Sequence, residues 1–370
     1  MRFLHTADWH VGKSLHGYDL LNEQQHIFQQ IEAIALEQKV DAIVIAGDLY
    51  DRSAPSEEAV SELNAELQRL NLHDQLPILA ISGNHDSAAR LATGDAWYSA
   101  TQFYLHTQLA QAFEPIVIGD TQFFLLPYFE LQVVRNYFGD DEIHSVKVAM
   151  ERIVAQMQDH FAPDKHQVLV AHFFAAGSSH TDSETKVEVG GLNAVPVDLL
   201  TAFDYVALGH LHNPNALKNP VIKYSGSPLK MSASEAELQK GVRIVDSATG
   251  ESTWVPLKPA HDVRIIKGSF DDLMQKTDEG DRDDFVVIQL TDQEMIPDVM
   301  SRLRQVYPRI IALQRVNGPV QMKIDTTIDP ALDPMQLVAK FYDFATDGHN
   351  LNPEQKEWLT QSLQRVQKGE

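Results

Sequence analysis

Short apolar runs punctuate the first 260 residues, and each run ends in polar residues. Uninterrupted apolar segments of this length are typical of strands that are buried on both faces of a sheet. Glycines near positions 226 and 250 predict hairpin turns among the later strands. The predicted strands are Arg2–His5, Ala42–Ala46, Ile78–Ile81, Thr121–Pro127, Gln167–Ala171, Tyr205–Leu208, Val221–Tyr224 and Gly241–Val245.

Helical patterns separate several of the early strands. Asn22–Lys39 and Glu57–Leu70 each place apolar residues on one stripe, at the spacing of an amphipathic helix. Alternation of strand and helix predicts an α/β fold with a mostly parallel central part and right-handed crossovers.

The pattern changes after Pro259, where a small α+β module is predicted. Two helices follow it, Met335–Ala345 and Pro353–Val366, and Asn352 is suited to cap the second. The acidic loop Asp278–Asp284 is interpreted as a solvated connection. The predicted strands of this module are Val263–Gly268, Phe285–Thr291 and Ile310–Val316. Its predicted amphipathic helix is Ile296–Tyr307.

Composition narrows the function classes. The 370-residue chain carries 30 Lys and Arg against 52 Asp and Glu, a formal charge of −22. Such a protein does not coat DNA by neutralising phosphates itself, although metal ions or a partner protein can supply positive charge locally. With no cysteine, disulfides, thiolate metal sites and cysteine nucleophiles are excluded. The chain has neither a signal-like start nor an apolar run of roughly 18 residues, so we expect a cytoplasmic protein without a membrane span.

Polar residues able to bind metals follow five of the predicted strands. Sites in open α/β sheets form beyond the carboxyl ends of strands, so these residues are expected to converge. Imidazole, carboxylate and one amide oxygen together favour Mn²⁺, Fe or Zn²⁺ over an all-oxygen Mg²⁺ or Ca²⁺ site. Taken singly, each motif is commonly a turn or a structural histidine. The occurrence of five such motifs, in order and each after a predicted strand, favours a metal centre. The motifs contain Asp8 and His10, Asp48, Asn84 with His85 and Asp86, His172, and His210 with His212.

In this order, the motifs Asp-x-His, Gly-Asp-x-x-Asp, Gly-Asn-His-Asp, His and Gly-His-x-His resemble the pattern of calcineurin-like metallophosphoesterases. The stretches MRFLHTADWHVGK, VDAIVIAGDLYDRSAPS, ISGNHDS, DYVALGHLH and YSGSP are similar to SbcCD-type nuclease subunits of the double-strand-break repair nuclease family. The resemblance implies a layered α/β/β/α metallophosphoesterase sandwich over residues 1–260. It further implies a small α+β capping domain over residues 261–325 and a C-terminal helix–loop–helix over residues 326–370.

The resemblance also implies two divalent metal ions, with Mn²⁺ the first candidate. One ion would be held by Asp8, His10, Asp48 and His212, and the second by Asp48, Asn84, His172 and His210. His85 resembles the acid that protonates the leaving oxygen or stabilises the pentavalent phosphorus, and Asp86 is expected to orient His85 through a hydrogen bond. Asp51 stands where some relatives have histidine, and we interpret it as a turn carboxylate.

The implied activity is that of a metal-dependent DNA exonuclease and endonuclease that processes double-stranded DNA ends or hairpins. The implied partner is an SbcC-type coiled-coil ATPase, bound through the C-terminal helices, in a heterotetramer built on a homodimer of this chain. Candidate dimer segments are Glu57–Leu70 and Ala96–Leu105, the latter with Trp97 and Phe103.

Two alternatives stay open at this point. One is a phosphatase or small phosphodiesterase on the same core, because residues 47–52 echo the phosphatase signature, although Ser53 stands where those enzymes keep glycine. The other is a non-catalytic scaffold that uses the fold for protein binding. Degenerate scaffolds lose ligands, whereas here every position of the set is filled.

Overall fold

The computed structural model describes residues 1–179, 181, 194–275, 280–316 and 351–368, together with residues 335, 338 and 342. The chain divides into two compact units, Met1–Val316 and Asn317–Glu370, and each is described by itself. The predicted boundary between residues 325 and 326 lies outside the described residues and stays a prediction.

Two β-sheets form the centre of the first unit. Parallel strands dominate both sheets, and the antiparallel pairs are β1 with β12, β12 with β13, and β7 with β8. The six-stranded sheet has the order β13 (Ser252–Pro256), β12 (Gly241–Asp246), β1 (Arg2–Thr6), β4 (Ala42–Ile45), β5 (Ile78–Ile81) and β6 (Phe103–His106). The five-stranded sheet has the order β11 (Ile222–Tyr224), β10 (Tyr205–Gly209), β9 (His166–His172), β8 (Thr121–Leu126) and β7 (Ile116–Ile118).

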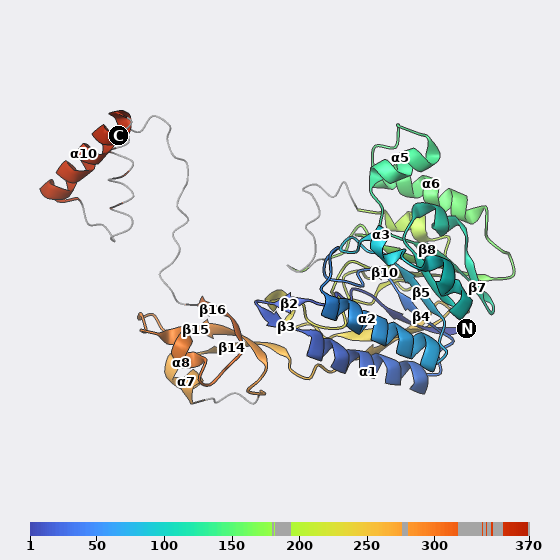
Figure 1. Cartoon of the computed structure of the whole chain (residues 1–370), viewed down its shortest axis with the longest axis horizontal. Coiled ribbons are helices and arrows are strands. Elements are labelled where there is room, and N and C mark those ends of the chain that lie inside the picture. Colours follow the sequence, from blue (N-terminus) through green and yellow to red (C-terminus); the bar gives the residue numbers. More distant parts are fainter. Residues whose placement is uncertain are drawn as a thin grey trace. The chain divides into compact units, whose positions relative to one another are not determined.

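Helices cover the outer face of each sheet. Helices α1 (Leu21–Glu37) and α2 (Glu57–Gln68) pack on the six-stranded sheet, and α5 (Leu131–Phe138) and α6 (Val146–Gln158) pack on the five-stranded sheet (Figure 1). A third apolar cluster, which includes Phe3, Val44, Phe123 and Val168, fills the space between the two sheets. The predicted α/β/β/α sandwich is therefore confirmed.

Shorter elements complete this unit. Two of them, β2 (Ser14–Leu15) and β3 (Tyr18–Asp19), form a small hairpin after the first polar loop. The remaining short helices are α3 (Ala88–Leu91), α4 (Asp95–Tyr98), η1 (Arg69–His73), η2 (Ser99–Thr101), η3 (Leu109–Phe113), η4 (Val197–Leu200) and η5 (Ala233–Glu235).

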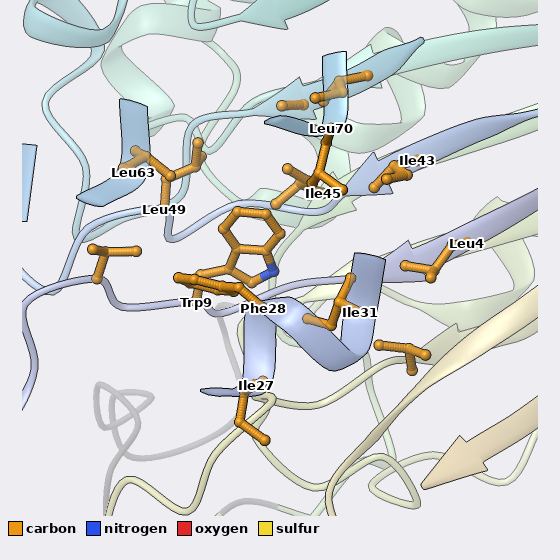
Figure 2. Close-up of a cluster of buried hydrophobic side chains, with 14 of the residues drawn as sticks. Leu4, Trp9, Ile27, Phe28, Ile31, Ile43, Ile45, Leu49, Leu63 and Leu70 are labelled. Atoms are coloured by element: carbon orange, nitrogen blue, oxygen red, sulfur yellow. The ribbon is translucent and has the colours of Figure 1, made fainter. Parts of the chain in front are cut away.

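Trp9 anchors the first polar loop to the core. Its fully buried ring lies 4.7 Å from the ring of Phe28, and its Nε1 donates a hydrogen bond of 3.0 Å to Thr6 Oγ1. Figure 2 shows the indole among apolar side chains from α1 and β4. On either side of Trp9, Asp8 and His10 have left-handed backbone conformations, with φ +54° and +44°.

The sequence pattern located all eight predicted strands but erred at one turn. The hairpin near Gly250 is present between β12 and β13. The prediction of a hairpin near Gly226 is wrong. Strand β11 pairs in parallel with β10, and β12 belongs to the other sheet. The chain crosses between sheets there, with Gly226 at φ +73°. Phe103, expected at a dimer surface, is buried in β6, whereas the Trp97 side chain is 76% exposed.

A parallel three-stranded sheet forms the small α+β module. Its order is β14 (Val263–Gly268), β15 (Phe285–Leu290) and β16 (Ile310–Arg315), and α7 (Phe270–Met274) and α8 (Val299–Leu303) pack on it. The predicted helix Ile296–Tyr307 is therefore too long at both ends. Asp298 has a left-handed backbone at the start of α8, with φ +52°.

The acidic loop of this module is not simply solvated. Asp284 is 5% exposed, and its carboxylate accepts hydrogen bonds from Asp262 N at 2.7 Å and from Arg264 Nε at 2.6 Å. The interpretation of residues 278–284 as a solvated connection is therefore wrong for Asp284, because this residue ties the loop to strand β14.

The β2–β3 hairpin joins the module to the sandwich. Leu15 and Leu20 share an apolar cluster with Val263 and Phe285, and the Tyr18 hydroxyl donates a hydrogen bond of 3.1 Å to the Pro308 carbonyl. These contacts place the module next to the segment that follows the Asp8–His10 loop.

In the second unit, α10 (Pro353–Lys368) confirms the predicted helix that starts at Pro353. Asn352 caps it as predicted, since its Oδ1 accepts a hydrogen bond of 2.8 Å from Gln355 N. The predicted helix Met335–Ala345 lies outside the described residues apart from residues 335, 338 and 342. No helix in the described part of the chain has the length and apolar composition required to cross a membrane.

Candidate metal centre

The predicted ligands lie where strands of both sheets end. In the six-stranded sheet, β1 and β4 pair in parallel, which brings the loops containing Asp8 and Asp48 together. In the five-stranded sheet, Gly209 pairs with His172, so His210 follows directly beside it. Hydrogen bonds then link the two sheets, because Asp8 Oδ1 accepts from the His210 backbone amide at 2.8 Å.

One half of the centre combines two imidazoles with carboxylates. His10 Nε2 and His212 Nε2 face each other at 3.1 Å, and His10 Nε2 lies 3.6 Å from Asp48 Oδ2. Asp8 Oδ2 is buried and has no hydrogen-bond partner in the part of the chain that the structure describes. These atoms belong to the four residues expected to hold the first metal ion.

The other half contacts the same carboxylate oxygen. His172 Nε2 lies 3.3 Å from Asp48 Oδ2 and 3.0 Å from Asn84 Oδ1. His210 Nδ1 also lies 3.0 Å from Asn84 Oδ1. Asp48 Oδ2 therefore lies within 3.6 Å of a ring nitrogen from each group, as expected of a bridging ligand.

Left-handed backbone conformations turn the ligands toward one another. Asp8, His10, Asp48 and His210 have φ values of +54°, +44°, +51° and +94°. Such conformations are costly for residues with a Cβ and concentrate at functional sites.

Glycine permits the close approach of these loops. A Cβ on Gly209 would overlap the Ala46 carbonyl oxygen, and one on Gly83 would overlap Asp48 Oδ1. Both positions therefore exclude any larger residue unless the backbone shifts.

Hydrogen bonds behind two histidines set which ring nitrogen faces the centre. The Ala46 carbonyl can only accept, so His172 donates from Nδ1 at 2.8 Å and turns Nε2 toward the centre. His212 Nδ1 lies 3.3 Å from Glu235 Oε1 in the same arrangement. Carboxylate and carbonyl partners of this kind orient metal-binding histidines.

Glu235 belongs to a buried ion pair that the sequence analysis missed. Its side chain is fully buried, and its Oε2 lies 2.5 Å from the Nζ of Lys240, which is 5% exposed. Lys240 Nζ also donates to the His212 carbonyl at 2.9 Å and to Ser227 Oγ at 2.8 Å. Acidic and basic residues five apart are common on surfaces, so only their burial behind His212 distinguishes this pair.

The centre is electrostatically suited to bind cations. Burial raises the pKa of Asp8 to about 6 even though imidazoles lie nearby. Burial alone would raise the pKa of Asp48 and lower that of His172, but their contact reverses both effects. The pKa of Asp48 falls below its usual range, and that of His172 rises to about 9. Two buried carboxylates thus draw positive charge into the site.

His85 lies beside the ligands without sharing their contacts. Its backbone amide donates to Asp48 Oδ1 at 2.9 Å, and its ring stands edge-on to the His10 ring with centroids 4.8 Å apart. Its Nδ1 donates a hydrogen bond of 2.9 Å to the Asp51 carbonyl oxygen. The ring is therefore fixed through Nδ1, which leaves Nε2 to carry or release a proton.

The expected role of Asp86 is wrong. Its carboxylate accepts hydrogen bonds from three backbone amides, those of Gly83, Leu49 and Tyr50, at 2.9, 3.1 and 2.9 Å. Burial and the charge of Asp48 raise its pKa to about 7. Asp86 joins the loops that follow β4 and β5, and the Asp51 carbonyl orients His85 in its place.

Asp51 is more than a turn residue, because its carboxylate also faces the centre. Its Oδ1 lies 2.8 Å from Lys13 Nζ and 3.8 Å from His10 Nδ1. Ligand atoms of His10, Asp51 and His85 lie within 4.8 Å of one another. This side chain borders the first half of the centre.

The donor set fits two divalent cations. Asp8 Oδ2, which has no hydrogen-bond partner among the described residues, is a buried carboxylate oxygen that is unfavourable without positive charge beside it. Imidazole, carboxylate and amide donors together suit Mn²⁺, Fe or Zn²⁺.

Comparison with known proteins gives a consistent result. Residues 1–214 match the family of calcineurin-like phosphoesterases, and residues 259–346 match the family described as type 5 capsule protein repressor C-terminal domain. The chain is 37% identical over 353 residues to the SbcD component of the SbcCD nuclease of Staphylococcus epidermidis, covering 94% of each chain.

Two solved structures are similar at low identity. TT1561 of Thermus thermophilus has a TM-score of 0.40 and 12% identity, covering 69% of this chain and 98% of that chain. Yfce, a phosphoesterase from E. coli, has a TM-score of 0.27 and 16% identity, covering 66% of this chain and 88% of that chain.

Proposed function

Since this chain belongs to the calcineurin-like phosphoesterase family, and within it to the SbcD-type nucleases, we propose that it hydrolyses phosphodiester bonds of double-stranded DNA ends and hairpins. The chain is a metallophosphoesterase, and therefore a hydrolase. The observation that carries the proposal is that Asp48 Oδ2 contacts both groups of donors, at 3.6 Å from His10 Nε2 and 3.3 Å from His172 Nε2. A shared carboxylate of this kind is the central ligand of a two-metal site.

The ligand assignment follows the two groups of donors. Asp8, His10, Asp48 and His212 would hold one ion, and Asp48, Asn84, His172 and His210 the other, with Mn²⁺ the first candidate. When bound, two such ions would lower the pKa of a water and offset negative charge on phosphate oxygens.

His85 is proposed to act on the leaving group. Its Nδ1–H is held by the Asp51 carbonyl at 2.9 Å, so the proton that it can transfer is on Nε2. Donation from Nε2 to the departing oxygen would complete bond cleavage without a covalent enzyme intermediate. The hydrogen bond from the His85 backbone amide to Asp48 Oδ1 keeps the ring beside the predicted metal ligands.

The charge of the chain points to a partner in DNA binding. A formal charge of −22 opposes association with a polyanion. We therefore expect an SbcC-type coiled-coil ATPase to supply tight DNA binding in the cytoplasm, with this chain as a homodimer within a heterotetramer. A salt titration of DNA affinity tests this, because nanomolar binding by the chain alone at physiological salt would contradict it.

Cleavage assays with four kinds of substrate test the proposed function. Purified protein with Mn²⁺ is incubated with linear duplex DNA, hairpin DNA, a phosphopeptide and a cyclic nucleotide. We expect cleavage of the DNA substrates and its loss in Asp48→Asn and His85→Ala. Turnover of the small substrates alone would support a phosphatase or small phosphodiesterase. Absence of bound metal, with both variants behaving as wild type in DNA processing, would support a non-catalytic scaffold.

A further inference from the structure

A cavity of about 520 Å³ adjoins the metal centre. Ser82, Gly83 and Asn84 line one end, and Tyr128, Phe129 and Tyr137 contribute aromatic rings. Asn84 thus belongs both to this cavity, the stacking pocket, and to the metal centre, where its Oδ1 contacts His172 and His210. A group in the pocket would therefore lie next to a phosphate held at the centre.

The aromatic side chains are exposed but held in place. Tyr128 and Tyr137 are 43% and 41% exposed. The ring of Tyr137 stacks on Phe113 with centroids 5.1 Å apart, and its hydroxyl accepts a hydrogen bond of 3.0 Å from Gln156 Nε2. The Tyr128 amide donates to the Ser82 carbonyl at 2.9 Å, which ties this residue to the end of β5. A ligand would meet a preformed surface and incur little ordering cost.

Tyr128 also lies within the field of the metal ligands. Burial raises the pKa of Tyr128, and the charges of Glu130 and Asp48 add to this effect. The geometric link between the pocket and the centre is Asn84, which lines the pocket and whose Oδ1 lies 3.0 Å from both His172 Nε2 and His210 Nδ1.

The charge of the pocket selects the type of ligand. Among the described residues that line it, none is Lys or Arg, and Asp86 and Glu130 are acidic. Such a lining disfavours a phosphate and suits a flat, uncharged, aromatic group. Its volume lies within the range of small-molecule sites, roughly 300–1,000 Å³.

We propose that the stacking pocket receives an unpaired nucleobase adjacent to the scissile phosphate. This inference rests on the proposed nuclease function and narrows its substrate to DNA whose terminal or looped nucleotides can leave the base stack. Stacking of a base on an aromatic side chain contributes about 1–3 kcal/mol. A base in a continuous duplex must first unpair and unstack, which offsets this gain. A base at a DNA end or in a hairpin loop therefore enters the pocket with the smallest free-energy cost of unpairing and unstacking.

Abasic substitution tests the proposal without altering the protein. Duplex and hairpin substrates carry a tetrahydrofuran abasic analogue on one side of the scissile bond or on the other. We expect kcat/KM to fall by about 5- to 150-fold for one of the two positions, the range that corresponds to the stacking energy. Equal cleavage of intact and abasic DNA would overturn the pocket assignment and leave the nuclease function intact. Failure to cleave any DNA would instead overturn the proposed function.

Variants then locate the effect. Tyr137→Leu and Tyr128→Leu should remove most of the discrimination between intact and abasic DNA, whereas Tyr137→Phe should retain it. Val117→Ala is the surface control, because this side chain is 52% exposed and lies outside the pocket. A 2-aminopurine at the sensitive position should be quenched on binding to wild type without Mn²⁺, and not to Tyr137→Leu. Full discrimination in both leucine variants, with unchanged quenching, would refute the proposal.

Discussion

The buried pair of Glu235 and Lys240 allows protein stability and metal affinity to be separated. Lys240→Met leaves the fully buried Glu235 carboxylate without the ammonium that lies 2.5 Å away. Removing one partner of a buried pair costs about 3–5 kcal/mol, because the remaining charge is uncompensated. We therefore expect Lys240→Met to unfold at a much lower urea concentration than wild type.

Glu235→Met combined with Lys240→Met should recover most of this stability. Replacing both charges by apolar side chains of similar volume is often neutral or stabilising. The double variant, however, removes the Glu235 carboxylate, whose Oε1 in wild type lies 3.3 Å from His212 Nδ1. Loss of an orienting partner of a metal-binding histidine weakens metal affinity by about 10- to 100-fold.

The two properties are measured separately. Urea unfolding in the presence of EDTA reports stability, and calorimetric titration of the metal-free protein with Mn²⁺ reports affinity. A double variant as unstable as Lys240→Met would show that the two charges are not coupled. A double variant that binds Mn²⁺ as tightly as wild type would show that Glu235 does not orient His212.

Three further predictions concern catalysis, packing and pH. His85→Ala should keep both metal ions by elemental analysis and lose DNA cleavage; loss of an ion would make His85 a ligand. Gly209→Ala should destabilise the protein by about 1–3 kcal/mol and abolish Mn²⁺ binding, because the Cβ would overlap the Ala46 carbonyl oxygen. Gly268→Ala, whose Cβ would have no contact closer than 3.4 Å, should do neither. Burial raises the pKa of Glu66 to about 7, so the folded state keeps a proton that the unfolded state has lost, and stability falls as pH rises from about 4.5 to 7. Glu66→Gln should therefore stabilise the protein by about 1–3 kcal/mol at pH 8 and little at pH 5, and an equal effect at both would refute this reasoning.

The sequence by itself located eight of the eleven strands in the two central sheets and a set of candidate metal ligands that lie together in the structure. Each ligand directly follows or lies just beyond a short apolar run, and the carboxyl ends of parallel strands meet at one edge of a sheet. Local pattern therefore predicted that Asp8, Asp48, Asn84, His172 and His210 would converge. The turn at Gly226 was misread because local pattern does not show which sheet the next strand joins.

Only the tertiary structure decided which groups support the ligands. Asp86 was expected to orient His85 because the two are adjacent, yet its carboxylate binds three backbone amides and the Asp51 carbonyl holds His85. Glu235 acts behind His212 through contacts between residues 23 positions apart. The burial of a side chain and the identity of its hydrogen-bond partners depend on how distant segments pack, and no local sequence pattern encodes them.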